Sequence, residues 1–210
     1  MIPFDELVAK RRSIRRYRAE IPPDEMILAM VRAALEAPSP SNSQPVRFIR
    51  LLSESLRDLL REGVAARREA LLGIAEKAGR PKWMKNRIRF YSRYMDFMFD
   101  APVLMAVATL RPPARPAGPE ELFGPRTNRV RLANLSMSAG LALMSYLLKG
   151  EELGLGSCIL SAPLLFLDDP EALLGLEEME LACFITTGYP AEEPPPPGKK
   201  ELGERYLYRS

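Results

Sequence analysis

The chain of 210 residues contains no histidine and only two cysteines, Cys158 and Cys183. Without histidine, catalytic sites that use an imidazole base and metal sites with histidine ligands are excluded. Two cysteines are too few for a zinc cluster, and their scarcity is typical of a reducing compartment. If the protein is an enzyme, we therefore expect its difficult chemistry to belong to a bound cofactor.

A long apolar run is also missing, as is an apolar signal segment at the N-terminus. The best membrane candidate, residues 132–148, is 17 residues without a formal charge and includes three serines and one asparagine. Since this length is short for a bilayer, the segment predicts a buried helix instead. We expect a cytoplasmic protein with no membrane partner.

The composition, 47% apolar and 27% charged with a net charge of +3, is that of an ordinary globular protein. Its length suits a single domain over residues 1–210. Helical and strand patterns alternate along the chain, which indicates a layered α and β architecture. Helices are predicted at 3–11, 23–37, from 53 onward, on both sides of 79–81, at 126–152 and in part of 163–174. Strands are predicted at 46–52, 103–109, 157–160 and 180–187. A surface loop is predicted at 111–119.

Three guanidinium groups surround a hydroxyl at Arg11, Arg12, Ser13 and Arg15. Arginine binds phosphate through two parallel N–H groups, and serine adds a short hydroxyl donor. On these residues alone, a phosphate site and a solvated basic helix end are equally good interpretations.

A second polar segment, residues 37–45, begins 22 residues after Arg15. Between two prolines it carries small hydroxyls and two amides, and its candidate binding residues are Pro38, Ser39, Asn42 and Gln44. An ordinary turn needs only one proline or asparagine, whereas amide donors and acceptors suit the edge of a flat heterocycle. Together the two segments predict a nucleotide-like cofactor, with a plain loop as the alternative for the second.

Gly154 and Gly156 join the long predicted helix at 126–152 to the strand at 157–160. A glycine here is expected to end the helix. The pair is not a dinucleotide fingerprint, because it follows a helix and lacks the third glycine. The functional interpretation is that the backbone of residues 159–162 passes close to a ligand.

The motifs at 11–17, 37–45, 154–158 and 188–190 occur in an order that closely resembles the FMN-dependent nitroreductase superfamily. The first two motifs are specific together, and the later two are weak alone. The resemblance implies an α+β fold with a mixed sheet sandwiched by helices. It also implies an interlocked homodimer with two FMN sites at the subunit interface.

The resemblance assigns roles to particular positions. It implies that the phosphate and ribityl groups of FMN are held by Arg11, Arg12, Ser13 and Arg15, with help for the phosphate from Lys199 and Lys200. It implies that the isoalloxazine is bordered by Pro38, Ser39, Asn42 and Gln44. It also implies that the backbone at the flavin N5 edge comes from Leu160, Ser161 and Ala162. No side chain is expected to act as an acid or base. The chain departs from the family at Val46, at Ser161 with Ala162, and at Met144 with Ser145, where aromatic, glycine and amide residues respectively are common.

The implied activity is that of an FMN oxidoreductase that takes hydride from NAD(P)H and reduces a nitroaromatic, a quinone or a flavin. Reductive dehalogenation and fragmentation of flavin occur among relatives and remain alternatives. The third alternative is a non-enzymatic module that binds anions or nucleic acid through the basic residues 61–93. No nucleic-acid partner is expected, because a net charge of +3 is small for such a protein.

Residues 61–93 contain ten Lys or Arg and three Glu, a local charge of +7. The segment 61–100 is expected to form a variable helical cover over the flavin, in which Trp83, Tyr91 or Tyr94 stacks on a flat acceptor. A pair of solvated basic helices is the alternative. The tail, residues 188–210, has too few apolar residues to pack alone and is expected to lie along another surface, for which a second subunit is one candidate.

Overall fold

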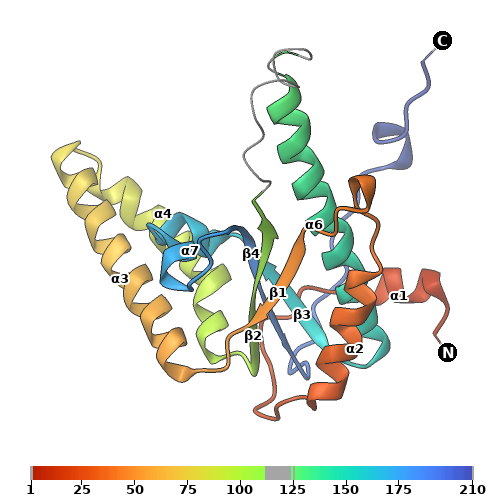
Figure 1. Ribbon diagram of the computed structural model, residues 1–210. Coiled ribbons are helices and arrows are strands. Elements are labelled where there is room, and N and C mark those ends of the chain that lie inside the picture. The colour runs from red at the N-terminus through yellow and green to blue at the C-terminus, as the bar shows by residue number, and fades with distance from the viewer. Residues whose placement is uncertain (1, 112–123, 125, 210) are drawn as a thin grey trace.

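The structure is a computed structural model that describes residues 2–111, 124 and 126–209. Its centre is a four-stranded sheet with the strand order β1-β2-β4-β3 (Figure 1). The strands are β1 (Val46–Arg50), β2 (Val103–Leu110), β3 (Gly156–Leu160) and β4 (Met179–Gly188). All three pairings are antiparallel, so β1 and β3 are the two edges of the sheet.

Helices cover both faces of the sheet (Figure 1). The long helices are α2 (Asp24–Leu35), α3 (Glu54–Lys77), α4 (Pro81–Met95) and α6 (Arg126–Glu152). The shorter ones are α1 (Phe4–Lys10), α7 (Pro170–Leu173) and the 3-10 turns η1 (Pro40–Asn42), η2 (Asp96–Asp100), η3 (Ala162–Phe166) and η4 (Leu202–Glu204).

Strand β2 shows why the molecule has two apolar layers. Successive side chains of a strand point to opposite faces. Val103, Met105 and Val107 accordingly pack with α2 and α6, whereas Leu104 and Ala106 pack on the other face with α3. Because both faces are covered, β2 is buried along nearly its whole length, as its continuous apolar sequence predicts.

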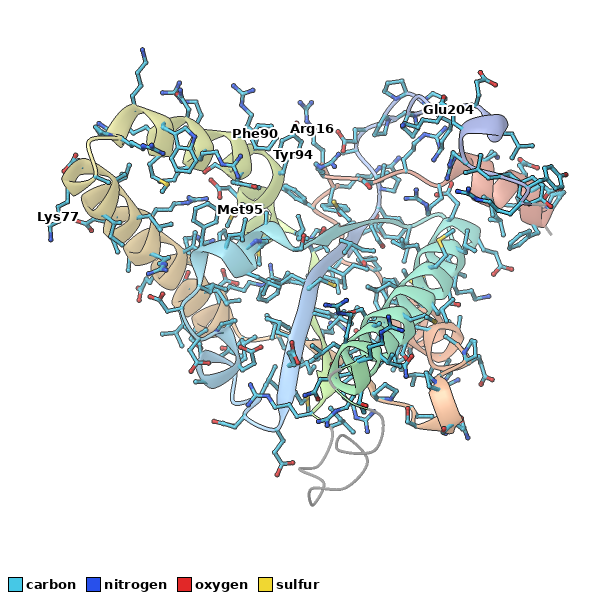
Figure 2. The ribbon with its side chains drawn as sticks, turned by 90° about the horizontal axis from the view of Figure 1, so that it is seen from above. Arg16, Lys77, Phe90, Tyr94, Met95 and Glu204 are labelled. Carbon is cyan, nitrogen blue, oxygen red and sulfur yellow. The ribbon has the colours of Figure 1, made fainter. Side chains whose placement is uncertain are left out.

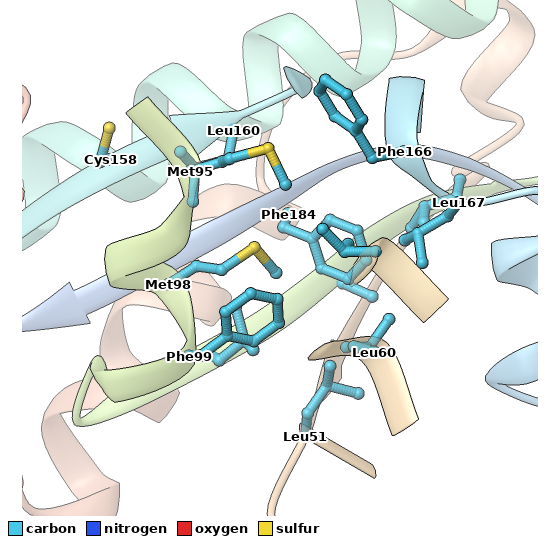
Figure 3. Packing of buried hydrophobic residues seen from close by; sticks show 14 of the residues in the cluster. Leu51, Leu60, Met95, Met98, Phe99, Cys158, Leu160, Phe166, Leu167 and Phe184 are labelled. Carbon is cyan, nitrogen blue, oxygen red and sulfur yellow. The ribbon is translucent and has the colours of Figure 1, made fainter. Parts of the chain in front are cut away.

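The layer beneath α3 and α4 is centred on Phe184 of β4, which has no exposed surface. Figure 3 shows Met98 and Phe99 from η2 and Leu60 from α3 around this ring. Phe166 and Leu167, which lie in and directly after η3, belong to the same cluster. The paired helices α3 and α4 are thereby fixed to the sheet and to the segment that follows β3.

The predicted elements are confirmed, including the break between α3 and α4 at residues 79–81. The α+β class is confirmed, but the sheet of the described chain is antiparallel rather than mixed. Among the described residues the parallel contact is a single bridge from Ser13 to Ser157, too short to form a strand. In the described part of the tail after β4, Pro190 forms a single bridge with Tyr17 and residues 202–204 form the short turn η4. Apart from Arg111, the loop predicted at 111–119 lies outside the described residues.

Helix α6 matches its predicted bounds and ends as expected. Gly154 has a φ of +74°, a conformation that glycine adopts without strain. Leu155 N–H donates to the carbonyl of Gly150 at 2.8 Å, and Gly154 N–H donates to that of Glu151 at 3.1 Å, the pair of bonds of a Schellman motif. No helix within the described ranges is both long and apolar enough to span a bilayer.

Candidate functional site

The arginine-rich segment that follows α1 lies against edge strand β3. Ile14 N–H donates to the carbonyl of Ser157 at 3.1 Å, and Ser13 forms a bridge with the same residue. The approach is close because Gly156 has no side chain: a Cβ placed there would lie 2.4 Å from Cγ1 of Ile14. The glycine that precedes Ser157 therefore makes room for the N-terminal segment.

The start of the C-terminal tail borders the same segment on its other side. Arg18 N–H donates to the carbonyl of Tyr189, and Ala191 N–H donates to that of Arg16, both at 2.9 Å. Glu192 follows at once, and its carboxylate accepts from the N–H of Arg15 at 2.6 Å and of Arg16 at 3.2 Å. The arginine segment thus lies between β3 and the tail.

Two guanidinium groups of this segment have unused hydrogen-bonding capacity. Arg12 Nη1 donates to the carbonyl of Ala9 at 2.6 Å, and Arg15 Nη1 to that of Ser13 at 3.4 Å. The Nε atoms of Arg12 and Arg15 are buried, and neither has a hydrogen-bond partner among the described residues. A buried donor without an acceptor is costly. These donors fit an anionic ligand such as the phosphate of FMN.

Buried hydroxyl groups hold the segment in register. Tyr17 Oη donates to the carbonyl of Ile14 at 2.5 Å and lies 2.8 Å from Oγ1 of Thr186. On the other face of β4, Thr187 Oγ1 lies 2.9 Å from both Tyr146 Oη and Ser157 Oγ. Burial raises the pKa of both tyrosines, so these phenols remain neutral at physiological pH.

Neither cysteine has the environment of a nucleophile. Both are buried. Burial raises the pKa of the Cys158 thiol, although the positive charge of nearby Arg15 opposes the change. Burial also raises the pKa of Cys183 to about 12. Because the thiolate is the reactive form, both side chains act as small apolar groups at neutral pH.

The second predicted segment forms a constrained loop around η1. Ser41, Asn42 and Gln44 have φ values of +54°, +52° and +44°, which non-glycine residues rarely adopt. Ser39 Oγ accepts from Gln44 N–H at 2.9 Å, and Gln44 Nε2 donates to Asn42 Oδ1 at 3.2 Å. The amides of Asn42 and Gln44 are exposed, so the loop presents polar edges outward. Pro38, Ser39 and Gln44 line a pocket of about 160 Å³ that also contacts Ser138 and Ala142 of α6.

One chain does not bring its two principal motifs together along the sheet. The arginine segment lies beside β3, whereas the loop leads into β1 at the opposite edge. Three gaps between strands, about 4.8 Å each, separate these edges by about 14 Å. The arginine segment contacts β3 at Ser157. The predicted residues Leu160, Ser161 and Ala162 come shortly after this contact in the chain, at the same edge of the sheet. Lys199 and Lys200 are exposed in the tail, where Lys200 Nζ lies 3.7 Å from a carboxylate oxygen of Glu204.

Helix α4 reaches both the arginine segment and η3. The guanidinium carbon of Arg15 lies 5.6 Å from the centre of the Tyr94 ring, and Tyr91 packs edge-on against Phe166 at 5.9 Å. Figure 2 shows Phe90 and Tyr94 at the rim of the molecule where Arg16 also lies. The predicted cover is therefore located beside the candidate site.

Farther along α4, Arg87 lies between two rings. Its guanidinium carbon is 5.7 Å from the centre of Trp83 and 5.2 Å from that of Tyr91. Trp83, Phe90 and Tyr94 are exposed in the single chain. This exposed face of the helix combines flat apolar groups with positive charge.

Sequence reasoning missed Glu192 and the contact of Tyr94 with Arg15. A local signal existed for Glu192, because an acidic residue directly follows the Gly-Tyr-Pro-Ala segment at 188–191. It had no interpretation until the tail was seen beside the arginine segment. The contact of Tyr94 joins residues far apart in the sequence and had no local signal.

Comparison with known proteins places this arrangement in context. The sequence profile of the nitroreductase family matches residues 8–189. An iodotyrosine deiodinase of Thermotoga neapolitana is 29% identical over 202 residues, covering 96% of each chain. An NADH dehydrogenase of Thermus thermophilus is 31% identical over 206 residues, covering 95% of this chain and 93% of the relative.

Solved structures share the fold. A BluB-like flavoprotein from Clostridium difficile 630 superimposes with a TM-score of 0.85 at 27% identity, and the match covers all of both chains. Other structures that match this chain contain bound FMN.

The close contact at Gly156 gives a prediction about stability. In Gly156→Ala the new Cβ collides with the branched side chain of Ile14, so we expect the free energy of unfolding to fall by about 1–3 kcal/mol, as in overpacked cores. Urea unfolding would measure it. Gly73→Ala is the matched control, because a Cβ at this helical glycine meets nothing within 4 Å. It should leave stability unchanged or raise it by up to about 1 kcal/mol. Equal stabilities for both variants would contradict the packing argument.

Proposed function

Because the chain belongs to the nitroreductase family, we propose that it is an FMN-dependent oxidoreductase that takes hydride from NAD(P)H and reduces an electron-poor small molecule. Family membership supports the general class of flavin oxidoreductase. The observation that carries the cofactor assignment is the pair of buried, unpartnered Nε atoms of Arg12 and Arg15. The NADH dehydrogenase relative supports a nicotinamide donor.

The proposed FMN site uses residues from three parts of one chain and a loop from a second. Arg11, Arg12, Ser13 and Arg15 hold the phosphate and ribityl groups, with help from Lys199 and Lys200. Backbone of Leu160, Ser161 and Ala162 borders the reactive edge of the ring, and Pro38, Ser39, Asn42 and Gln44 contact the ring system. When bound, FMN supplies the hydride and electron transfer chemistry that protein side chains lack.

The side chains of the chain bind and orient rather than exchange protons. The chain has no histidine, and burial keeps Tyr17, Tyr146 and Cys158 protonated. Holding two reactants in contact accounts for a large part of many rate accelerations. In this proposal α4 covers the site, limits the access of water and gives a flat acceptor an aromatic surface at Tyr94.

A homodimer completes the site in this proposal. The two motifs lie at opposite edges of one sheet, and a two-fold partner would bring the loop of one chain to the arginine segment of the other. Helix α6 carries an exposed apolar row at Met137, Leu141 and Met144, with exposed fractions of 57%, 41% and 38%. The tail adds exposed Leu202, Tyr206, Leu207 and Tyr208. Apolar surface of this extent is typical of an interface between proteins.

Reductive dehalogenation of an aromatic compound is the second candidate. An iodotyrosine deiodinase matches nearly the whole chain, and Arg87 between Trp83 and Tyr91 offers a cationic aromatic surface suited to a halogenated phenolate. The two candidates separate by product: a dehalogenase releases halide from a halophenol, whereas a nitroreductase consumes NAD(P)H with a nitroaromatic and releases none.

The phosphate assignment predicts the effect of removing Arg15. In Arg15→Ala the binding free energy of FMN should weaken by about 1.5–3 kcal/mol, the usual contribution of a charged hydrogen bond. Ser13→Ala should have a smaller effect in the same direction. Quenching of flavin fluorescence on titration with apoprotein measures both dissociation constants. Arg18→Ala is the control, because that side chain is exposed and the hydrogen bond of Arg18 to Tyr189 uses the backbone N–H. Unchanged affinity in both test variants would refute the assignment.

The dimer proposal predicts that a charge on α6 separates the subunits. Met137→Glu should shift the protein toward monomer and lower its FMN content, because the carboxylate would be buried at the interface without a partner. Sedimentation velocity at micromolar concentration and the flavin absorbance of the purified protein provide the readouts. Ile74→Glu, at an equally exposed position on α3, should leave both unchanged. A parent chain that sediments as a stable, FMN-loaded monomer would overturn the proposal.

The cover on α4 is proposed to attract anionic reactants. Replacing Arg87, Arg89 and Arg93 together with glutamine should raise KM for NAD(P)H or for an anionic acceptor by roughly tenfold at low salt, since charged surfaces enhance encounter by such factors. It should also flatten the dependence of KM on ionic strength. Lys77→Gln, at the exposed end of α3, serves as the control. If KM, kcat and the salt dependence all match the parent, α4 does not guide reactants by charge.

A further inference from the structure

We propose that Glu192 is a positioning residue for the phosphate-binding arginines. Its carboxylate holds the backbone of Arg15 and Arg16 so that the guanidinium groups of the segment are directed at the cofactor phosphate. The inference rests on the proposed FMN function and extends it to a tail residue outside the arginine motif.

The contacts of Glu192 are unusually direct for a residue in a proline-rich tail. One carboxylate oxygen accepts two successive backbone N–H groups, at 2.6 Å from Arg15 and 3.2 Å from Arg16. Successive N–H groups form a concave site for an anion, and here the side chain of the protein itself occupies it. The Glu192 side chain is 23% exposed, and its ion pair with Nε of the exposed Arg16 side chain is long, at 3.9 Å. The backbone contacts are therefore the significant ones.

The position of Glu192 determines which part of the segment it controls. Ile14 is already held by Ser157 of β3, and Tyr17 is held by Thr186 of β4. Between them, the amide of Arg15 is bound by Glu192, while its side chain is held by the ring of Tyr94 and by a long 3.4 Å hydrogen bond. Without Glu192, the residue with an unpartnered buried Nε would lose its backbone anchor.

The carboxylate of Glu192 carries the same sign of charge as phosphate and would also repel it. The sign of the change in FMN affinity when the carboxylate is removed therefore tests the inference. If positioning dominates, removing the carboxylate weakens FMN binding. If repulsion dominates, removing it strengthens binding. We expect positioning to dominate, because residues 11–18 carry five arginines whose positive charge offsets the repulsion between this carboxylate and a phosphate.

The experiment compares FMN with riboflavin, which lacks the phosphate. In Glu192→Ala apoprotein, fluorescence titration should give a dissociation constant for FMN about tenfold above that of the parent, as loss of a charged hydrogen bond implies. The constant for riboflavin should stay unchanged. Glu193→Ala is the matched control, because the neighbouring carboxylate is exposed, and it should bind both flavins as the parent does.

Two further variants keep the test decisive if Glu192→Ala does not fold. Glu192→Gln retains an oxygen that can accept both N–H groups and should bind FMN almost as the parent does. Glu192→Asp retains the charge but shortens the reach, and it should bind FMN more weakly. The opposite order would overturn the inference, as would unchanged or tighter FMN binding in Glu192→Ala, or an equal loss for FMN and riboflavin. A parent chain that binds no FMN defeats the proposed function itself, a result distinct from all of these.

Discussion

Two adjacent threonines near the end of β4, Thr186 and Thr187, are fully buried on opposite faces of the sheet. A buried hydroxyl needs a partner, and each threonine finds one on a different element. Tyr17 meets Thr186 from the N-terminal segment, and Tyr146 of α6 meets Thr187. Because Ser157 also joins Thr187, this one pair of side chains fixes the arginine segment, the long helix and edge strand β3 relative to one another.

The secondary structure was largely predictable, because its signals are local. The apolar period of residues 26–35, the prolines and glycines between elements, and the continuous apolar run of β2 each determine their own element. The candidate arginine motif was predictable for the same reason. The order of the strands in the sheet was not predictable, because it depends on which strands pair with one another. For the same reason, the placement of the two motifs at opposite edges of the sheet could not be predicted.

Contacts between distant residues account for what the sequence could not show of the candidate site. The hydrogen bond of Glu192 to Arg15 spans 177 positions, and no periodicity or spacing connects such residues. The placement of Tyr94 against Arg15 likewise depends on the packing of α3 and α4 against η3. The conformation of the strained loop at Ser41, Asn42 and Gln44 could not be predicted for a different reason. Positive φ values at non-glycine residues have no reliable signal in the sequence. Such strain occurs most often at functional positions.

The placement of the two motifs at opposite sheet edges has a consequence for how the proposed cofactor is retained. A ligand that touches groups from two chains binds the assembled pair more tightly than either chain alone, and by linkage it holds the pair together equally. In the proposed dimer, occupancy would follow mass action in protein as well as in flavin, so dilution of the protein alone would release cofactor. In a cell, the amount of this protein would set the fraction that is coloured and competent.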